Sequence, residues 1–206
     1  MLSIRGKHAA GIEPANLARQ ISGYQHVLID LGAGDGRFVR HVAETRPDTF
    51  AIGIDLCGDN LRKTGRRAPD NALFVIASAY APPPELHGKA THLTINFPWG
   101  DLLTGLLAHD ERLLAALDAL CRPGARVEVR INAGAITEVG WSLSAASVAV
   151  RRALHEAGFA VGAHPRLLDA SDLRAFPSTW ARRLAFGRDA RALYFEGVKV
   201  ADVRVA

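Results

Sequence analysis

The sequence contains little cysteine and no long apolar run. Only two of its 206 residues are cysteine, and neither Cys57 nor Cys121 belongs to a C-x-x-C pair, which argues against a disulfide framework and a structural zinc site. The eight histidines show no ligand spacing, so we expect no metal. No apolar stretch reaches the roughly 18 residues of a membrane span, and the N-terminus lacks a signal-peptide pattern. These absences favour a reducing, cytoplasmic setting.

The composition is that of a folded domain with a mild positive charge. Hydrophobic residues make up 49 % of the chain, which excludes intrinsic disorder. A length of 206 residues suits one domain, with a short N-terminal extension at 1–23 and insertions at 133–144 and 169–190. The formal net charge is +4 and the pI is about 9.4, which hints at an anionic partner without identifying it.

Apolar residues alternate along the chain between strand-like and helix-like spacing. Strands are expected at 26–32, 50–55, 72–78, 92–97, 125–132, 159–168 and 191–200. Helices are expected at 37–47, 60–68, 110–124 and 145–158, with a loop at 133–144 and a helix broken around Pro177 at 171–187. This order predicts an α/β fold in which a seven-stranded, mostly parallel, doubly wound sheet is flanked by helices.

A glycine-rich loop follows the first of these strands. Its pattern D-x-G-x-G-x-G consists of Asp30, Gly32, Gly34 and Gly36. A dinucleotide fold prefers G-x-G-x-x-G at a helix N-terminus that holds a pyrophosphate, so this spacing counts against a nicotinamide cofactor. Glycines let the backbone pass beneath a ligand, and Asp30 can attract an ammonium group. The loop therefore predicts S-adenosylmethionine, which carries an ammonium and a sulfonium but no phosphate.

Residues at the next strand ends complete the predicted cofactor site. Asp55 ends the second strand, 19 residues after Gly36, where a carboxylate can accept both ribose hydroxyls. Leu56 follows and can cover one face of the adenine, while the end of the third strand offers an edge for the same ring. The further positions assigned to the cofactor are Ala79, Tyr80, Asn96 and Leu102.

The motif N-F-P-W-G at 96–100 follows the fourth strand, beside the expected cofactor cleft. It differs by one substitution from the N/D-P-P-Y/F/W motif of amino-methylating DNA enzymes. An aromatic face can hold an unstacked nucleobase, at ~1–3 kcal/mol per base, and Pro98 fixes the main chain beside it. Trp99 could hold one face of the base and Trp180 the other. Core packing is the alternative for both tryptophans, but each stands beside a proline break at an element end.

The third tryptophan and the clusters of basic residues also allow predictions. Trp141, in the loop after the fifth strand, is either a core residue or part of a lid. The expected helix at 60–68 contains no acidic residue three or four positions from Arg62 or Lys63, so its charges would repel one another unless an external polyanion neutralised them. We therefore favour a nucleic acid over a solvated charged face. The basic residues assigned to it are Arg62, Lys63, Arg66, Arg67, Arg152, Arg182, Arg183 and Arg188.

Four stretches together resemble one known family: D-L-G-A-G-D-G-R, G-I-D before a basic helix, N-F-P-W-G-D-L-L and P-S-T-W-A-R-R. This family is the 16S ribosomal RNA adenine-1408 N1-methyltransferases, the kanamycin–apramycin aminoglycoside-resistance enzymes, and the likeness spans residues of about 28 to 195. It implies a class I methyltransferase Rossmann-like fold, S-adenosylmethionine as cofactor and docking to the assembled 30S subunit. It also implies that Trp99 and Trp180 stack on a flipped adenine bordered by Pro98 and Ser178.

The chain departs from this family at two positions. Asp101 stands where a small hydroxyl residue is expected, and Tyr80 stands where an acidic residue is expected at the cofactor adenine. The chemistry implied needs no general base, because adenine N1 has an in-plane lone pair, and proximity and orientation can supply ~7–11 kcal/mol at best. We expect a monomer, and resistance to aminoglycosides is a possible consequence of the reaction.

Three other functions fit the same residues. An N6-adenine or N4-cytosine methyltransferase would use Asn96 to accept a hydrogen bond from the exocyclic amine. A small-molecule methyltransferase would use the tryptophans to line an aromatic pocket. A non-catalytic RNA-binding module would keep a vestigial cofactor site.

Overall fold

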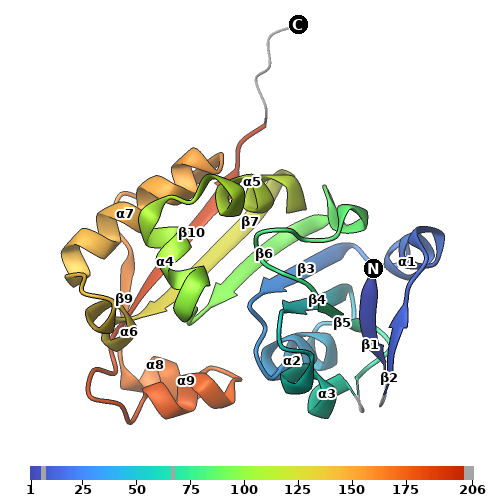
Figure 1. Cartoon of the computed structure of the whole chain (residues 1–206), viewed down its shortest axis with the longest axis horizontal. Helices are drawn as coiled ribbons and strands as arrows, with labels where there is room; N and C mark the ends of the chain where they lie inside the picture. The colour runs from blue at the N-terminus through green and yellow to red at the C-terminus, as the bar shows by residue number, and fades with distance from the viewer. Residues whose placement is uncertain (6–7, 66–67, 202–206) are drawn as a thin grey trace, which may run out of the picture.

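The computed structural model describes residues 1–5, 8–65 and 68–201, which form one twisted sheet with helices on both faces (Figure 1). The strands are β1 Leu2–Arg5, β2 His8–Gly11, β3 His26–Leu31, β4 Thr49–Asp55, β5 Ala72–Ile76, β6 Ala90–Asn96, β7 Cys121–Asn132, β8 Phe159–Val161, β9 Arg166–Leu168 and β10 Ala192–Lys199. The helices are α1 Pro14–Ile21, α2 Arg37–Thr45, α3 Gly58–Gly65, α4 Gly100–Ala108, α5 Glu111–Leu120, α6 Ala133–Glu138, α7 Leu143–Glu156, α8 Ala170–Ala175 and α9 Thr179–Leu184, with a 3-10 turn η1 at Pro84–Leu86.

The strand order is β2-β1-β5-β4-β3-β6-β7-β10-β8, and β9 also pairs with β10. The five strands from β5 to β7 are parallel to one another, whereas the strands at both edges pair in antiparallel fashion. Central parallel strands are covered on both faces and are therefore apolar, and six of the seven residues of β4 are buried. The predicted α/β fold with a largely parallel sheet is confirmed, but the described sheet has ten strands rather than the predicted seven.

Three hydrophobic clusters hold the layers together. The largest packs α1, α4, α5 and α7 against one face of the sheet, and a smaller one packs α2 and α3 against the other face. A third cluster joins α8 and α9 to β9, β10 and Phe97. This third cluster matters for function because it attaches the segment that contains Trp180 to the end of β6 by apolar burial.

The structure corrects the prediction of a loop at 133–144. Residues Ala133–Glu138 form α6, and Asn132 begins it by accepting a hydrogen bond on its side chain from the backbone N–H of Ala135 at 3.1 Å. An asparagine at the N-cap is a recognised helix signal. Here Asn132 is also the last residue of β7, so the sequence shows no break between the strand and the helix. Only the stretch from Val139 to Ser142 separates α6 from α7.

Other boundaries also differ from those expected. The predicted strand at 159–168 is divided into β8 and β9, and the N-terminal region contributes a hairpin of β1 and β2 that pairs with β5. Helix α5 ends at Leu120, so C-R-P-G belongs to β7 rather than to a helix stop. There the register against β6 shifts between Ala90 and His92, an irregularity that the positive φ of Gly124 permits.

Within the described ranges, no helix is long and apolar enough to cross a membrane.

Candidate active site

The predicted cofactor residues gather at the carboxyl edge of the parallel strands. Asp30 lies one residue before the end of β3, Asp55 is the last residue of β4, and Asn96 is the last residue of β6. Figure 1 shows α8 and α9, in orange, beyond the arrow tips of β6 and β7 at this same edge. Open α/β sheets bind ligands outside the carboxyl ends of their strands, so the edge is the expected place for a cofactor.

The glycine-rich loop has a conformation that other residues could not adopt. Gly32 and Gly36 have φ values of 77° and 71°, in the region that strains any side chain. A Cβ atom on Gly32 would also meet Leu102 Cδ2 at 2.7 Å, and one on Gly36 would meet Phe74 Cε1 at 2.5 Å. The loop is tied to β4 because the Asp55 carboxylate accepts the backbone N–H of Gly34 at 2.8 Å. The result is a stretch of backbone without side chains at its glycines, held in place at the carboxyl edge of the sheet.

Asp30 is a buried carboxylate with donors on one oxygen. Its Oδ1 accepts the Thr94 hydroxyl at 2.6 Å and the Asn96 amide at 2.8 Å, and no hydrogen bond within the described ranges reaches Oδ2 from another side chain. Burial raises the pKa of Asp30 to about 7, although the two hydrogen bonds and the charge of Arg130 act in the opposite direction. A buried carboxylate with one open oxygen fits a cationic ligand group, which would favour its ionised form.

Both ends of the Asn96 amide are hydrogen-bonded to neighbouring side chains. Its Nδ2 donates to Asp30, and its Oδ1 accepts from Arg130 Nη1 at 2.9 Å. The carbonyl oxygen therefore lies toward Arg130 of β7, and the NH₂ group supports the Asp30 carboxylate.

The part of the site that is expected to bind the cofactor adenine combines an exposed apolar side chain with a tyrosine that is hydrogen-bonded to α4. Leu56, which follows Asp55, is 73 % exposed, so its side chain is free to cover a flat ligand. Ala79, which precedes Tyr80, is half-buried. The Tyr80 hydroxyl donates to the backbone oxygen of Asp101 at 2.6 Å, and a Cβ atom on Gly105 would collide with it. The two positions that depart from the family are thus in direct contact.

The N-F-P-W-G motif makes a sharp reversal between β6 and α4. Phe97 is buried and has a φ of 54°, a left-handed conformation that costs roughly 1–3 kcal/mol for a bulky residue. Its N–H donates to the Arg130 backbone oxygen at 2.7 Å. Pro98 is buried, and Trp99 becomes the N-cap of α4. The turn therefore places Trp99 at the surface while anchoring the preceding ring in the core.

Trp99 and Trp180 meet at the site, as the sequence predicted that they would. Their ring centroids are 5.9 Å apart with an interplanar angle of 86°, and the two residues are 46 % and 40 % exposed. The alternative of core packing is therefore wrong for both. The rings contact each other edge to face, whereas a base between two parallel faces needs roughly twice the 3.5 Å contact distance, ~7 Å. Holding a base between them requires one ring to rotate.

The segment around Trp180 is shaped by caps and aromatic contacts. Ser178 is the N-cap of α9, and its Oγ accepts the Ala181 N–H at 3.1 Å. Phe176 stacks on Phe38 of α2 at 5.0 Å and meets Phe97 edge to face at 5.3 Å. Sequence reasoning identified Ser178 but missed Phe176, whose position before Pro177 carries no functional signal by itself.

The basic residues have different surroundings. Arg62 pairs with Asp59 at 3.2 Å, so the expectation that it lacks an acidic partner is wrong, because α3 begins at Gly58 and includes that aspartate. Arg152 pairs with Glu156 at 2.8 Å. Arg66 and Arg67 lie outside the described residues, as does the Lys63 side chain. Three exposed arginines near Trp180 have no ion pair with any described residue: Arg182, Arg183 and Arg188.

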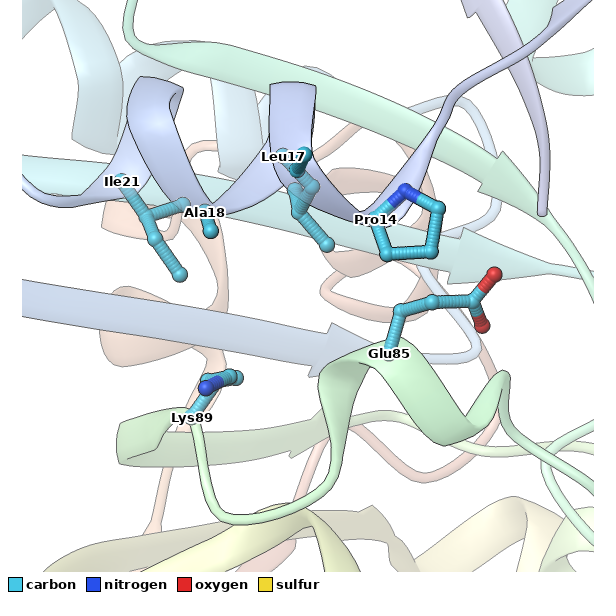
Figure 2. A pocket seen from close by; sticks show the side chains of 7 residues that line it. Pro14, Leu17, Ala18, Ile21, Glu85 and Lys89 are labelled. Atoms are coloured by element: carbon cyan, nitrogen blue, oxygen red, sulfur yellow. The ribbon is translucent and has the colours of Figure 1, made fainter.

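The remaining polar groups and hollows do not compete with this site. Trp141 is 37 % exposed, so it is not a core residue. No group of three or more potential metal ligands occurs in the part of the chain that the structure describes. A hollow of about 330 Å³ lies between α1 and the turn before β6. Figure 2 shows Leu17, Glu85 and Lys89 among the side chains that line it. It lies at the amino ends of the strands, where parallel sheets do not bind their ligands.

Comparisons with known proteins agree on one family. The model of the NpmA family, 16S rRNA (adenine(1408)-N(1))-methyltransferase, matches residues 2–199. The 16S rRNA (adenine(1408)-N(1))-methyltransferase of Escherichia coli is 31 % identical over 206 residues, which cover 91 % of this chain and 94 % of that protein. The enzyme of the same description from Streptoalloteichus tenebrarius is 29 % identical, with 92 % and 94 % covered.

Solved structures give the same result. A variant of the 16S rRNA (adenine(1408)-N(1))-methyltransferase from Catenulisporales acidiphilia, solved with its cosubstrate SAM, superposes with a TM-score of 0.87 at 25 % identity over 100 % of both chains. The antibiotic-resistance methyltransferase Kmr superposes with a TM-score of 0.80 at 32 % identity, over 98 % of this chain and 99 % of that one.

Proposed function

Because the chain belongs to the family of 16S rRNA (adenine(1408)-N(1))-methyltransferases, we propose that the glycine-rich loop and the pair Trp99–Trp180 form its active site. The enzyme transfers a methyl group from S-adenosylmethionine to N1 of adenine 1408 in 16S rRNA. The observation that carries the proposed site is the contact between the exposed rings of Trp99 and Trp180. Trp99 begins α4, and the Leu102 side chain of this helix lies against Gly32 of the glycine-rich loop. The family assignment leaves no support for the exocyclic-amine, small-molecule or non-catalytic hypotheses.

The residues at the edge fit the cofactor. Bare glycine backbone gives room for the ligand, and the open Oδ2 of Asp30 suits the ammonium of its methionine part. Asp55 has both oxygens on backbone N–H groups, of Gly34 and of Cys57 at 2.8 Å each, yet each oxygen keeps a second lone pair for a ribose hydroxyl. Leu56 and Ala79 then flank the adenine, with Tyr80 holding α4 beside it.

The chain's own residues contribute orientation rather than proton transfer. S-adenosylmethionine supplies an electrophilic methyl group on a sulfonium. Trp99 and Trp180 hold the target adenine flat between their rings after one ring rotates, and Pro98 and Ser178 border it. Adenine N1 would attack the methyl carbon through its in-plane lone pair while the bond from that carbon to the sulfonium sulfur breaks and the rest of the cofactor leaves as a neutral thioether, so no side chain has to remove a proton. The N1-methyl product is cationic, and the faces of two indoles stabilise a cation at ~0.5–2 kcal/mol.

We further propose that the substrate is the assembled 30S subunit, that a single copy of the chain acts on it without a metal ion, and that it does so in the bacterial cytoplasm. A folded subunit presents many phosphates, and exposed arginines bind them with a strength that falls as salt rises. Arg182, Arg183 and Arg188 project from or follow α9, the helix that contains Trp180. Resistance to aminoglycosides is the expected consequence, and the similarity to Kmr, an antibiotic-resistance methyltransferase, supports it.

The experiment that tests this function is primer extension on 30S subunits incubated with the enzyme and S-adenosylmethionine. A methyl group on N1 blocks Watson–Crick pairing, so reverse transcriptase should stop one nucleotide before adenine 1408. Mass spectrometry of the digested RNA should identify 1-methyladenosine. A methyl group on an exocyclic nitrogen, or methylation of free RNA but not of subunits, would contradict the proposal.

Charge reversal on α9 should weaken subunit methylation. The double variant Arg182→Glu, Arg183→Glu is expected to lower the methylation rate at limiting subunit concentration by about tenfold, because each lost phosphate contact weakens electrostatic binding. Affinity for S-adenosylmethionine, measured by calorimetry, should stay unchanged. Arg122→Glu is the control, because Arg122 is also exposed but lies near the start of β7, at the opposite end of the sheet. Equal losses in both variants would indicate a general charge effect and would contradict an interface at α9.

A further inference from the structure

We propose that Arg130 is a positioning residue that joins the cofactor side of the site to the segment that contains Trp180. The proposal rests on the proposed function for its activity arm only. Arg130 lies on β7, near its carboxyl end, and its side chain is 15 % exposed. Neither the glycine-rich loop nor the tryptophan motifs include it. What distinguishes Arg130 is that its guanidinium contacts residues of both halves of the site.

On the cofactor side, Arg130 fixes the orientation of an amide. Its Nη1 donates to Asn96 Oδ1 at 2.9 Å, which leaves Asn96 Nδ2 to donate to Asp30 Oδ1 at 2.8 Å. If the amide were turned over, the Asn96 oxygen would face the Asp30 carboxylate and its NH₂ group would face the guanidinium, and both contacts would be unfavourable. Arg130 therefore determines that Asp30 receives a donor, which favours its ionised form.

On the target side, the same guanidinium lies between two aromatic rings. Arg130 Cζ is 4.6 Å from the centroid of Tyr194 and 5.1 Å from that of Phe176. Arginine stacks on rings because its guanidinium is planar and weakly hydrated, whereas a lysine ammonium is a compact, strongly hydrated charge. Phe176 is therefore held against β7 by a contact that lysine would not reproduce.

Phe176 in turn fixes the start of the Trp180 segment. It also contacts Phe38 and Phe97 through its ring, and its backbone oxygen accepts the Ser178 N–H at 2.8 Å. Ser178 caps α9, and Trp180 is the second residue of that helix. A shift of Phe176 would thus be passed through one short turn to the ring that faces Trp99, and small displacements of reacting groups lower rates strongly.

Glu128 is the carboxylate that pairs with the Arg130 guanidinium, and it does not contact Asn96 or Phe176 in the described residues. Its Oε2 accepts a hydrogen bond from Arg130 Nη2 at 2.7 Å, and its Oε1 forms an ion pair with Arg126 Nη2 at 2.8 Å. Arg126 lies on the same strand, pairs with the same carboxylate and is exposed, and no contact joins it to Asn96 or Phe176. Arg126 is therefore the control. Its replacement by lysine changes the same kind of group at the same carboxylate, and its other contacts, with the Tyr194 hydroxyl at 3.4 Å and with Glu196 at 3.1 Å, do not reach Asn96 or Phe176.

The test compares Arg130→Lys with Arg126→Lys in the full chain. For Arg130→Lys we expect S-adenosylmethionine to bind with a Kd raised by a few fold and the single-turnover rate of subunit methylation to fall by about tenfold, as a loss of geometry rather than charge. For Arg126→Lys we expect both values to remain within twofold of the wild type. Equal losses in the two variants, or a wild-type rate for Arg130→Lys, would overturn the proposal.

A second arm tests whether Arg130 and Phe176 act together. Phe176→Leu retains apolar volume but removes the stacking face, so it should lower the rate without changing the cofactor Kd, and combining it with Arg130→Lys should lower the rate by less than the product of the two effects. Strictly multiplicative effects would contradict the link.

Fluorescence tests the link even if the protein does not methylate subunits. In the background Trp99→Phe, Trp141→Phe, Trp180 is the only tryptophan. Arg130→Lys should increase the quenching of its fluorescence by acrylamide, and Arg126→Lys should not. Unchanged quenching in the Arg130 variant would refute the structural link, whereas absence of methylation in the wild type alone would refute only the proposed function.

Discussion

Replacing Trp99 or Trp180 by alanine is expected to lower methylation of 30S subunits by about 100-fold while the protein remains folded. A base stacked on one aromatic side chain gains ~1–3 kcal/mol per base, and every 1.4 kcal/mol is a factor of ten in an equilibrium. Loss of one ring also lets the base tilt, so that N1 no longer points along the line of transfer. The combined effect is larger than that of any other single substitution at the target side.

The fold should survive because neither ring contributes much to the core. Trp99 and Trp180 are 46 % and 40 % exposed, and they contact each other edge to face. Their removal therefore costs part of one aromatic pair, ~0.5–1.5 kcal/mol. Thermal unfolding should shift by only a few degrees, which circular dichroism can check, while S-adenosylmethionine binding should remain within a few fold of the wild type.

Phenylalanine substitutions and a third tryptophan provide the controls. Trp99→Phe and Trp180→Phe keep a flat face and should retain more activity than the alanine variants. Trp141→Phe alters an exposed ring in the turn between α6 and α7 and should leave the rate within a few fold. A full rate in either alanine variant, or unfolding of either, would show that the indoles do not clamp the substrate.

The cofactor edge could be predicted from the sequence because its signals are local. A strand followed by D-x-G-x-G-x-G places glycines where the φ values of Gly32 and Gly36 are positive, and the next strand end gives Asp55. The meeting of Trp99 with Trp180 could be proposed from their positions beside proline breaks at element ends and from the family resemblance, but not from their spacing, since 80 residues separate them. Sequence spacing carries no information about which distant loops a sheet brings together.

The supporting residues could not be found in this way. Arg130 lies within a strand, where a charged residue in alternation with apolar ones is ordinarily a solvent-facing position. Its contacts with Asn96 and Phe176 depend on the pairing of β6 with β7 and on the docking of α8 and α9. The ion pair of Arg62 was missed for a simpler reason: the predicted helix began two residues late and excluded Asp59.

Replacing Asp30 by asparagine is expected to weaken cofactor binding and, in the absence of cofactor, to stabilise the protein above neutral pH. Burial raises the pKa of Asp30 to about 7 from a usual value of 3.8. The charge of Asp55 raises it further, and Thr94, Asn96 and Arg130 lower it. A pKa near 7 means that the carboxylate is half protonated under physiological conditions when no cation is bound beside it.

The sign of the stability effect follows from the direction of this shift. Because the folded pKa is above the unfolded value, the folded protein binds the proton more tightly than the unfolded chain between pH 4 and 7. The stabilising effect of that proton is fully present below about pH 4 and is lost as the pH rises through 7. At pH 8 an ionised Asp30 therefore lowers the free energy of unfolding by up to a few kcal/mol, at 1.36 kcal/mol per pKa unit.

The cofactor reverses this balance because its ammonium requires the ionised form. For the wild type, affinity for S-adenosylmethionine should increase roughly tenfold between pH 6 and pH 8, as the ionised fraction of a group with a pKa near 7 grows. Asp30→Asn should bind the cofactor at least tenfold more weakly at pH 8, since a charge-assisted contact has become neutral. Its affinity should also be almost independent of pH across this range.

Calorimetry of cofactor binding and denaturant unfolding, each at pH 6 and pH 8, measure the two halves of this prediction. Without cofactor, Asp30→Asn should have a higher free energy of unfolding than the wild type at pH 8, and the difference should shrink toward pH 6. With saturating cofactor the order should reverse, because ligand binding stabilises only the form that binds it. A pH-independent affinity in the wild type would show that Asp30 does not contact the ammonium group. The ammonium would then bind at another part of the carboxyl edge of the sheet.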